Sequence, residues 1–237
     1  MNRIFKAVAV FGVVASAWLG TAAQAETVTF VLSGQILNGV DDVGIFGTVG
    51  GNLAGMHFTQ TISTDLSNGF GNGWSNPPTD YARWGFGSTS FTGATTVNGH
   101  TFNWSFTGAD GEYSLNHNGM FSGDQISLSG SNGYNESTGA LISATNHVIS
   151  VTTPLLNNVD PHQSVVSNGP NMEGLSNFSV NYGASGGMTY FSSRLTDSIA
   201  LNTPAVPEPE TYALMLAGLG MVGMLARRRK AANANFA

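Results

Sequence analysis

The chain has 237 residues, no cysteine and a formal net charge of −6. Only 9% of its residues are charged, and most basic ones lie near the two ends, so residues 26–204 hold twelve acidic but only two basic side chains. Such an acidic stretch repels phosphate backbones and argues against nucleic-acid binding, while the lack of cysteine excludes disulfides and thiol chemistry.

The first 25 residues have the three parts of a secretory signal peptide. Arg3 and Lys6 supply positive charge, an apolar stretch follows, and Ala23-Gln24-Ala25 places small residues where signal peptidase requires them. We expect signal peptidase to cleave after Ala25 and to leave Glu26 as the N-terminus. A short N-terminal membrane anchor is the alternative.

Residues 26–204 alternate between apolar and polar side chains, which indicates β-strands. The clearest case is 101–107, where three aromatic residues fall on one face. The Asn98-Gly99 pair before it is a strong hairpin signal. Further strands are expected at 27–36, 55–64, 125–129, 140–152, 177–182 and 187–201. With no long amphipathic helix and no fixed-period repeat, the pattern predicts an all-β single domain, an antiparallel β-sandwich or jelly-roll-like fold.

The stretch from residue 67 to residue 80 is rich in Gly, Asn, Ser and Pro and carries unexpected aromatic rings. Phe70 and Trp74 lie within it, and Tyr81 and Trp84 follow closely. Exposed rings beside amide groups can stack on sugar faces, so these four residues are candidate carbohydrate contacts. The alternative is that Phe70 and Trp74 fold back and close the end of the domain.

The acidic residues favour calcium over zinc as a candidate metal cofactor, although the chain requires none. Asp41, Asp42, Asp110 and Glu112 lie in Asn- and Gly-rich surroundings, where oxygen ligands could gather around Ca²⁺. None of them fits the spacing of an EF-hand loop. The alternative is that they are solvated acids that keep the domain soluble.

No pattern singles out a catalytic residue. The five histidines form no H-E-x-x-H motif, no serine lies in G-x-S-x-G, and the glycines at 44–55 are followed by neither a lysine nor a helix pattern. A glycosidase would need two carboxylates facing one another, for which Asp110, Glu112 and Asp124 are the candidates. A non-enzymatic protein is the preferred interpretation, and a secreted hydrolase is the alternative.

The C-terminal segment combines an extended motif, an apolar helix and a basic cluster. Pro207-Glu208-Pro209 resists helix formation, and the apolar stretch 211–226 would span about 24 Å as a helix. Arg227, Arg228, Arg229 and Lys230 then hold its end on the cytoplasmic side. The domain before it would therefore lie outside the cytoplasm, and an ordinary tail anchor would have the same consequence.

Residues 205–230 resemble the PEP-CTERM sorting signal of Gram-negative bacteria, with the same three parts in the same order. The resemblance implies that an exosortase, a membrane-embedded enzyme, processes the chain near Pro207, Glu208 and Pro209. It also implies an inner-membrane intermediate, a final place at the cell surface or in the extracellular matrix, and an association with exopolysaccharide and biofilm. The short tail 231–237 departs from the usual pattern, which ends soon after the arginines.

Overall fold

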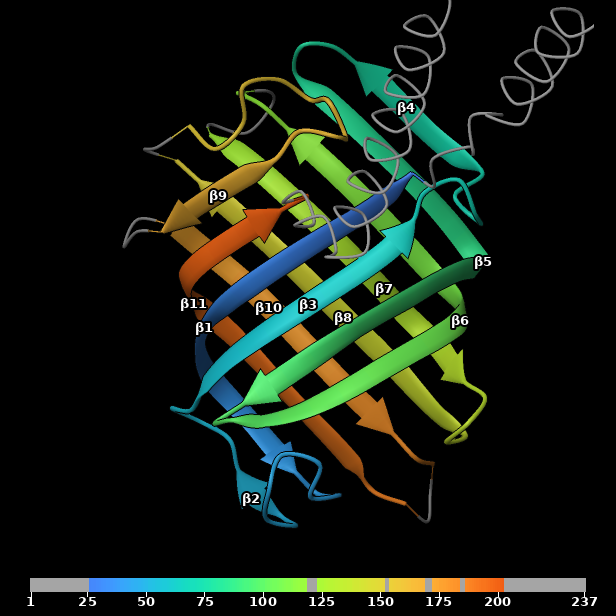
Figure 1. Cartoon of the computed structure of the whole chain (residues 1–237), viewed down its shortest axis with the longest axis vertical. Helices are drawn as coiled ribbons and strands as arrows, with labels where there is room; N and C mark the ends of the chain where they lie inside the picture. The colour runs from blue at the N-terminus through green and yellow to red at the C-terminus, as the bar shows by residue number, and fades with distance from the viewer. Residues whose placement is uncertain (1–25, 119–122, 152–153, 169–171, 184–185, 203–237) are drawn as a thin grey trace, which may run out of the picture. The chain divides into compact units, whose positions relative to one another are not determined.

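The computed structural model describes residues 26–118, 123–151, 154–168, 172–183 and 186–202 (Figure 1). The predicted signal peptide and the predicted sorting segment lie outside these residues. The chain divides into two compact units, Met1–Asn202 and Thr203–Ala237, and all described residues belong to the first.

All regular structure in the described part of the chain is β-strand, so the all-β prediction is confirmed. The strands are β1 (Thr27–Asp41), β2 (Gly51–Asn52), β3 (His57–Asp65), β4 (Asn72–Asn76), β5 (Asp80–Val97), β6 (His100–Asn116), β7 (Asp124–Asn135), β8 (Ala140–Ser150), β9 (Val165–Asn168), β10 (Met172–Asn181) and β11 (Met188–Leu201). The predicted hairpin at Asn98-Gly99 joins β5 to β6, and both residues have the positive φ of a type I′ turn (47° and 85°).

The strands form one antiparallel sheet that closes on itself, which differs from the two separate sheets of a sandwich. The order β1-β3-β5-β6-β7-β8-β10-β11 returns to its start because β1 also pairs with β11. The short strands β2, β4 and β9 extend it along β1, β5 and β11. Closure gives the long strands partners on both sides, which removes the exposed edges that invite aggregation.

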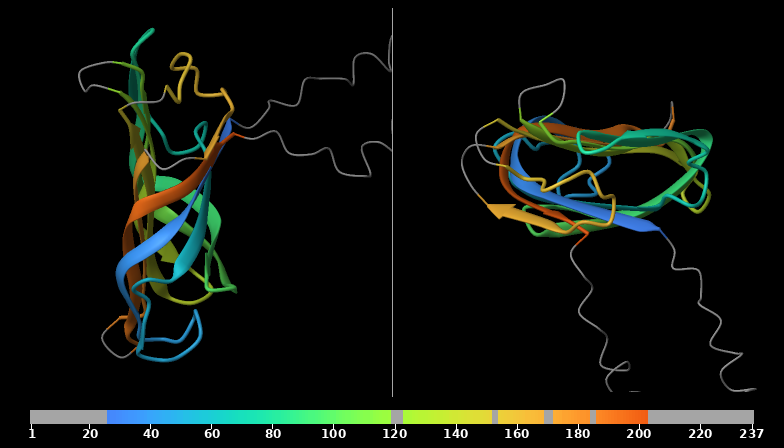
Figure 2. Two further views of the ribbon diagram at one scale, coloured as in Figure 1. Left: turned by 90° about the vertical axis from the view of Figure 1, so that its left-hand side faces the viewer. Right: turned by 90° about the horizontal axis from the view of Figure 1, so that it is seen from above.

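The closed sheet is flattened, so two walls face one another (Figure 2). In Figure 1 the front wall contains β3, the first part of β1 and the adjoining halves of β5 and β6, and the back wall contains β7, β8, β10 and the first part of β11. The paired strands β1 and β11 both curve from one wall to the other. The strands β5 and β6 take part in both walls because they are long and their pairing shifts between Gly85 and Phe91. Side chains that point inward therefore meet those of the opposite wall.

A cluster of aromatic rings lies between the walls, among a larger number of aliphatic side chains. Trp104 and Phe106 stack with ring centroids 5.4 Å apart, and Phe178 lies within 6.1 Å of Trp104 and 5.9 Å of Phe191. All four are at most 4% exposed. The alternation predicted for 101–107 accordingly places Trp104 and Phe106 in the core, with Phe102 partly buried beside them.

A buried pair of amides bridges the two walls. Asn146 on β8 donates from Nδ2 to the carbonyl oxygens of Phe30 (3.1 Å) and Gln60 (3.0 Å) on the front wall. Gln60 on β3 donates from Nε2 to the carbonyl oxygens of Thr145 (3.0 Å) and Asn177 (3.2 Å) on the back wall. Both side chains are fully buried, so these bonds form where water cannot compete.

Candidate functional site

The four aromatic residues predicted to contact carbohydrate do not share one environment. Phe70 is buried and packs edge-on against Phe91, with centroids 6.1 Å apart. It belongs to the core and is not available to a surface ligand, because its ring closes the space beside β5. Tyr81 is half-buried and packs against Tyr113. Trp74 is 51% exposed on β4, and Trp84 is partly exposed on β5.

Trp84 lines a shallow groove of about 320 Å³ on the outer face of the back wall, here called the Trp84 groove. Its lining residues are Trp84, Phe86, Asp110, Gly111, Glu112, Ser129 and Ser131. Trp84 lies directly opposite Glu112 on β6, and Glu112 lies opposite Ser129 on β7. Residues paired in this way share one face of the sheet, so an aromatic ring, a carboxylate and a hydroxyl point outward in one row.

A bulge in β5 presents the second aromatic ring of the groove. The pairing of β5 with β6 shifts between Gly85 and Thr89, and Gly87 has a φ of +65°. The amide of Gly87 donates to Oδ1 of Asp110 at 2.9 Å, which fixes the bulge. Phe86 is left 70% exposed at its crest. Sequence analysis missed Phe86, although an aromatic residue between two glycines within a strand pattern is a signal for such a bulge.

Two carboxylates give the groove its negative charge. Asp110 and Glu112 are two residues apart on β6, so their Cα atoms lie about 7 Å apart along the same face. They stand side by side and do not face one another across a cleft. No basic residue is among the lining residues of this groove. An uncharged ligand with hydroxyl groups to donate is the chemistry that this arrangement suits.

Comparison with known proteins identifies the C-terminal segment. A family model for the PEP-CTERM protein-sorting motif matches residues 205–230. The chain carries a PEP-CTERM sorting motif. Pro207, Glu208, Pro209 and the basic cluster Arg227–Lys230 fall inside the matched range. No curated protein and no solved structure matches the chain.

The PEP-CTERM motif assigns the chain to the exported substrates of an exosortase. It indicates a membrane-held intermediate and then a place at the cell surface. Within the part of the chain that the structure describes, no helix is long and apolar enough to cross a membrane. The predicted helix 211–226 and the signal peptidase site at Ala23, Ala25 and Glu26 lie outside that part and stay predictions.

Among the calcium candidates of this PEP-CTERM protein, Asp41 already has protein partners. Its Oδ1 accepts hydrogen bonds from the amides of Gly44 and Ile45 and from Oγ1 of Thr189, at 2.8–2.9 Å. Its Oδ2 accepts a bond from the amide of Phe46 at 2.8 Å. Asp41 is fully buried and holds the turn after β1, which explains an acid at this position without a metal.

The other calcium candidates do not form one site with Asp41. Asp42 is exposed beside the turn, and Asp110 and Glu112 lie in the Trp84 groove. Over the described ranges, no three His, Cys, Asp or Glu side chains gather closely enough to hold a metal ion. Calcium at Asp110 and Glu112 stays a prediction, and any such site would need main-chain or hydroxyl oxygens as further ligands.

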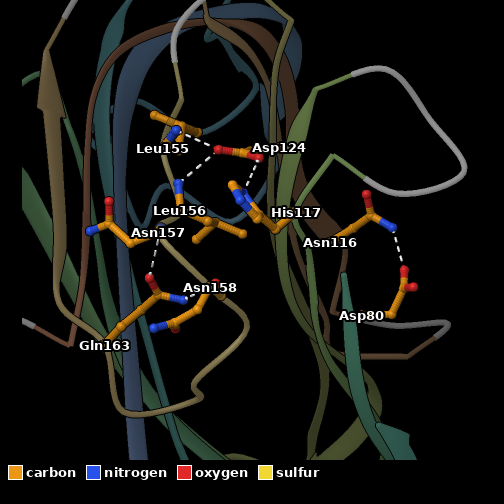
Figure 3. A network of polar contacts seen from close by, with 9 residues as sticks. All are labelled: Asp80, Asn116, His117, Asp124, Leu155, Leu156, Asn157, Asn158 and Gln163. Atoms are coloured by element: carbon orange, nitrogen blue, oxygen red, sulfur yellow. Dashed lines mark hydrogen bonds and ion pairs between the residues drawn. The ribbon is translucent and has the colours of Figure 1, made fainter. Parts of the chain in front are cut away.

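Asp124 is a structural residue, as Figure 3 shows. Its buried carboxylate accepts hydrogen bonds from the amides of Leu155 (2.6 Å) and Leu156 (2.7 Å) through Oδ2. Its Oδ1 accepts a bond from Nδ1 of His117 at 2.8 Å. These bonds attach the segment 154–164 to β7. Asp124 therefore does not share a site with Asp110 and Glu112, because its side chain faces inward and theirs face outward.

Proposed function

We propose that residues 26–204 form a non-enzymatic, exported matrix domain that binds exopolysaccharide at the Trp84 groove. The observation that carries the proposal is the partly exposed ring of Trp84 and the exposed ring of Phe86, beside the outward carboxylates and hydroxyls of β6 and β7. Rings of this kind stack on the apolar faces of sugars, and the neighbouring oxygen atoms accept hydrogen bonds from sugar hydroxyls.

The export route would bring the domain to the place where its proposed ligand is found. Signal peptidase would release the N-terminus at Glu26, and an exosortase would process the C-terminus near Pro207, Glu208 and Pro209. The domain would then reach the cell surface or the extracellular matrix of a Gram-negative bacterium, where exopolysaccharide is abundant. Its scarcity of basic residues supports a neutral ligand in preference to a phosphate-bearing one.

A secreted hydrolase is the alternative, and the arrangement of the acids disfavours it. Glycosidases place two carboxylates on either side of the scissile bond. Asp110 and Glu112 project from one strand in the same direction, and Asp110 already accepts a hydrogen bond from the bulge at Gly87. Asp124 points into the domain interior and is occupied by three donors.

Affinity gel electrophoresis tests the proposal. The full chain is run through gels that contain hydroxyethylcellulose, dextran, galactomannan or alginate, and its mobility is compared with that in an empty gel. We expect a neutral polysaccharide to retard the wild type, and Trp84→Ala and Phe86→Ala to lose about three- to tenfold in affinity. Tyr134→Ala is the matched control, because Tyr134 is 49% exposed but lies outside the groove. Equal retardation of all variants, or none of the wild type, would contradict the proposal.

A further inference from the structure

A second groove lies on the same outer face of the back wall. It measures about 350 Å³, and its outward lining residues are Asn38, Ser143, Thr145, Asn177, Ser179, Met188, Tyr190 and Ser192. Tyr190 is 40% exposed within it. This Tyr190 groove resembles the Trp84 groove in its chemistry, since both combine an accessible ring with hydroxyl or amide groups.

One row of paired residues runs through both grooves. The register places Trp84 opposite Glu112, Glu112 opposite Ser129, and Ser129 opposite Thr145. The row continues from Thr145 to Asn177, from Asn177 to Ser192, and from Ser192 to Asn38. Every member lines one of the two grooves, and none is buried.

The two grooves meet at the Ser129–Thr145 pair. Ser129 is in the Trp84 groove, Thr145 is in the Tyr190 groove, and they are direct partners across β7 and β8. Neighbouring strands lie about 4.8 Å apart, so the six steps from Trp84 to Asn38 cover roughly 29 Å of sheet surface. Each strand thus contributes one outward side chain, and the row is long enough to contact an extended oligosaccharide.

The side chains of the row favour one class of polymer over others. Ser129, Thr145, Asn177, Ser192 and Asn38 can accept, and donate, hydrogen bonds without carrying a charge. No Lys, Arg or His lines either groove, whereas Asp110 and Glu112 line the first. An anionic polymer would be repelled by Asp110 and Glu112 in the first groove, and an apolar one would leave the polar groups of both grooves without partners. A neutral, hydroxyl-rich polymer satisfies them.

We propose that the two grooves form one continuous track that binds a neutral, extended polysaccharide crosswise to the strands, with Trp84 and Tyr190 contacting sugar rings near its two ends. This inference rests on the proposed function and adds the direction, the length and the second half of the binding surface. Because each strand contributes one contact, affinity should grow with oligomer length until the oligomer covers the track.

The test uses the neutral polysaccharide that most retards the wild type in the affinity gels. That polymer is partially hydrolysed and sorted by size, and the affinity of the full chain for each fraction is measured by calorimetry. We expect affinity to rise at least about tenfold from disaccharide to the length that spans the track, and then to level off. Tyr190→Ala should weaken binding of long oligomers about as much as Trp84→Ala does.

Thr145→Arg probes the point where the grooves meet. Its long side chain would obstruct the track at the edge of the Tyr190 groove but leave the Trp84 groove and the Tyr190 ring in place, so long oligomers should bind no better than short ones. Tyr134→Ala is again the control, and thermal unfolding checks that each variant is folded. Two results would overturn the single track and leave the proposed function standing. The first is that disaccharides bind as tightly as long oligomers. The second is that Tyr190→Ala and Thr145→Arg bind like the wild type while Trp84→Ala does not. If no polysaccharide retards the wild type, both fail.

Discussion

At the scale of single residues, the amide of Asn146 joins the two walls by hydrogen bonds. It donates to two carbonyl oxygens on the front wall and accepts bonds from Gln60 and Ser176 through Oδ1 (3.0 Å each). Asn146→Leu would remove these bonds and leave buried polar partners unsatisfied, so we expect a loss of about 2–4 kcal/mol in the free energy of unfolding. Urea denaturation of the wild type and the variant measures this loss. Ser127→Ala, on the outer face of β7, is the control, and a change below about 0.5 kcal/mol in Asn146→Leu would contradict the role given to it.

His147 should make the free energy of unfolding depend on pH. Burial lowers its pKa below the ordinary value of 6.5, although the charge of Glu112 acts in the opposite direction. The unfolded chain therefore binds a proton more readily than the folded chain, so stability should fall as pH drops below about 6.5. Urea titrations of wild type and His147→Gln at pH 7.5 and 5.5 test this. We expect a smaller loss of stability between the two pH values in the variant, and an equal loss in both proteins would refute the assignment.

At the scale of elements, Asp124 attaches a long connection to the sheet. The segment 154–164 has little regular structure, yet Leu155 and Leu156 are buried and their amides bind the Asp124 carboxylate. Asp124→Ala should release these amides to solvent and lower stability by about 2–3 kcal/mol, since both bonds are charge-assisted. Hydrogen exchange at Leu155 and Leu156 is the direct measurement. Protection equal to that of the wild type would show that apolar packing alone holds the segment.

The element-level predictions from sequence succeeded where the information is local. The alternation along 101–107 and the Asn98-Gly99 turn both involve residues that are close in sequence. The first predicts β6, and the second predicts the β5–β6 hairpin. Closure of the sheet could not be predicted, because it depends on pairing Phe30 with Leu201, far apart in sequence. The inward amides Gln60 and Asn146 occupy apolar positions of the alternation, and only the opposite wall explains them.

The candidate site was predicted in part. Trp84, Asp110 and Glu112 were each singled out for separate reasons, and register alone brings them into one groove. Phe70 was misplaced because a Gly- and Asn-rich stretch does not reveal whether its ring turns inward. Phe86 was missed since its exposure depends on a bulge, and Tyr190 because its groove needs partners from β1, β8 and β10.

At the scale of the whole molecule, the sorting motif predicts two forms of the chain. In a host that has an exosortase, the intact mass should correspond to a chain cut near Pro207 and the protein should leave the membrane fraction. In a host without the enzyme, the full C-terminus should remain with the membrane. Replacing Pro207 and Glu208 by alanine should keep the chain in the membrane form in both hosts. A tail that persists in both hosts with the wild-type motif would contradict exosortase processing.

The pairing of β11 has a mechanical consequence. This strand is hydrogen-bonded to β1 along one edge and to β10 and then β9 along the other, and it ends at Leu201. If the C-terminus were held while a ligand pulled on the back wall, the tension would enter at Asn202 and run along the axis of β11. A load in that direction shears many ladder bonds at once and does not unzip them singly. The strand that closes the sheet is thus also the one through which a pull on the C-terminus would reach the rest of the domain.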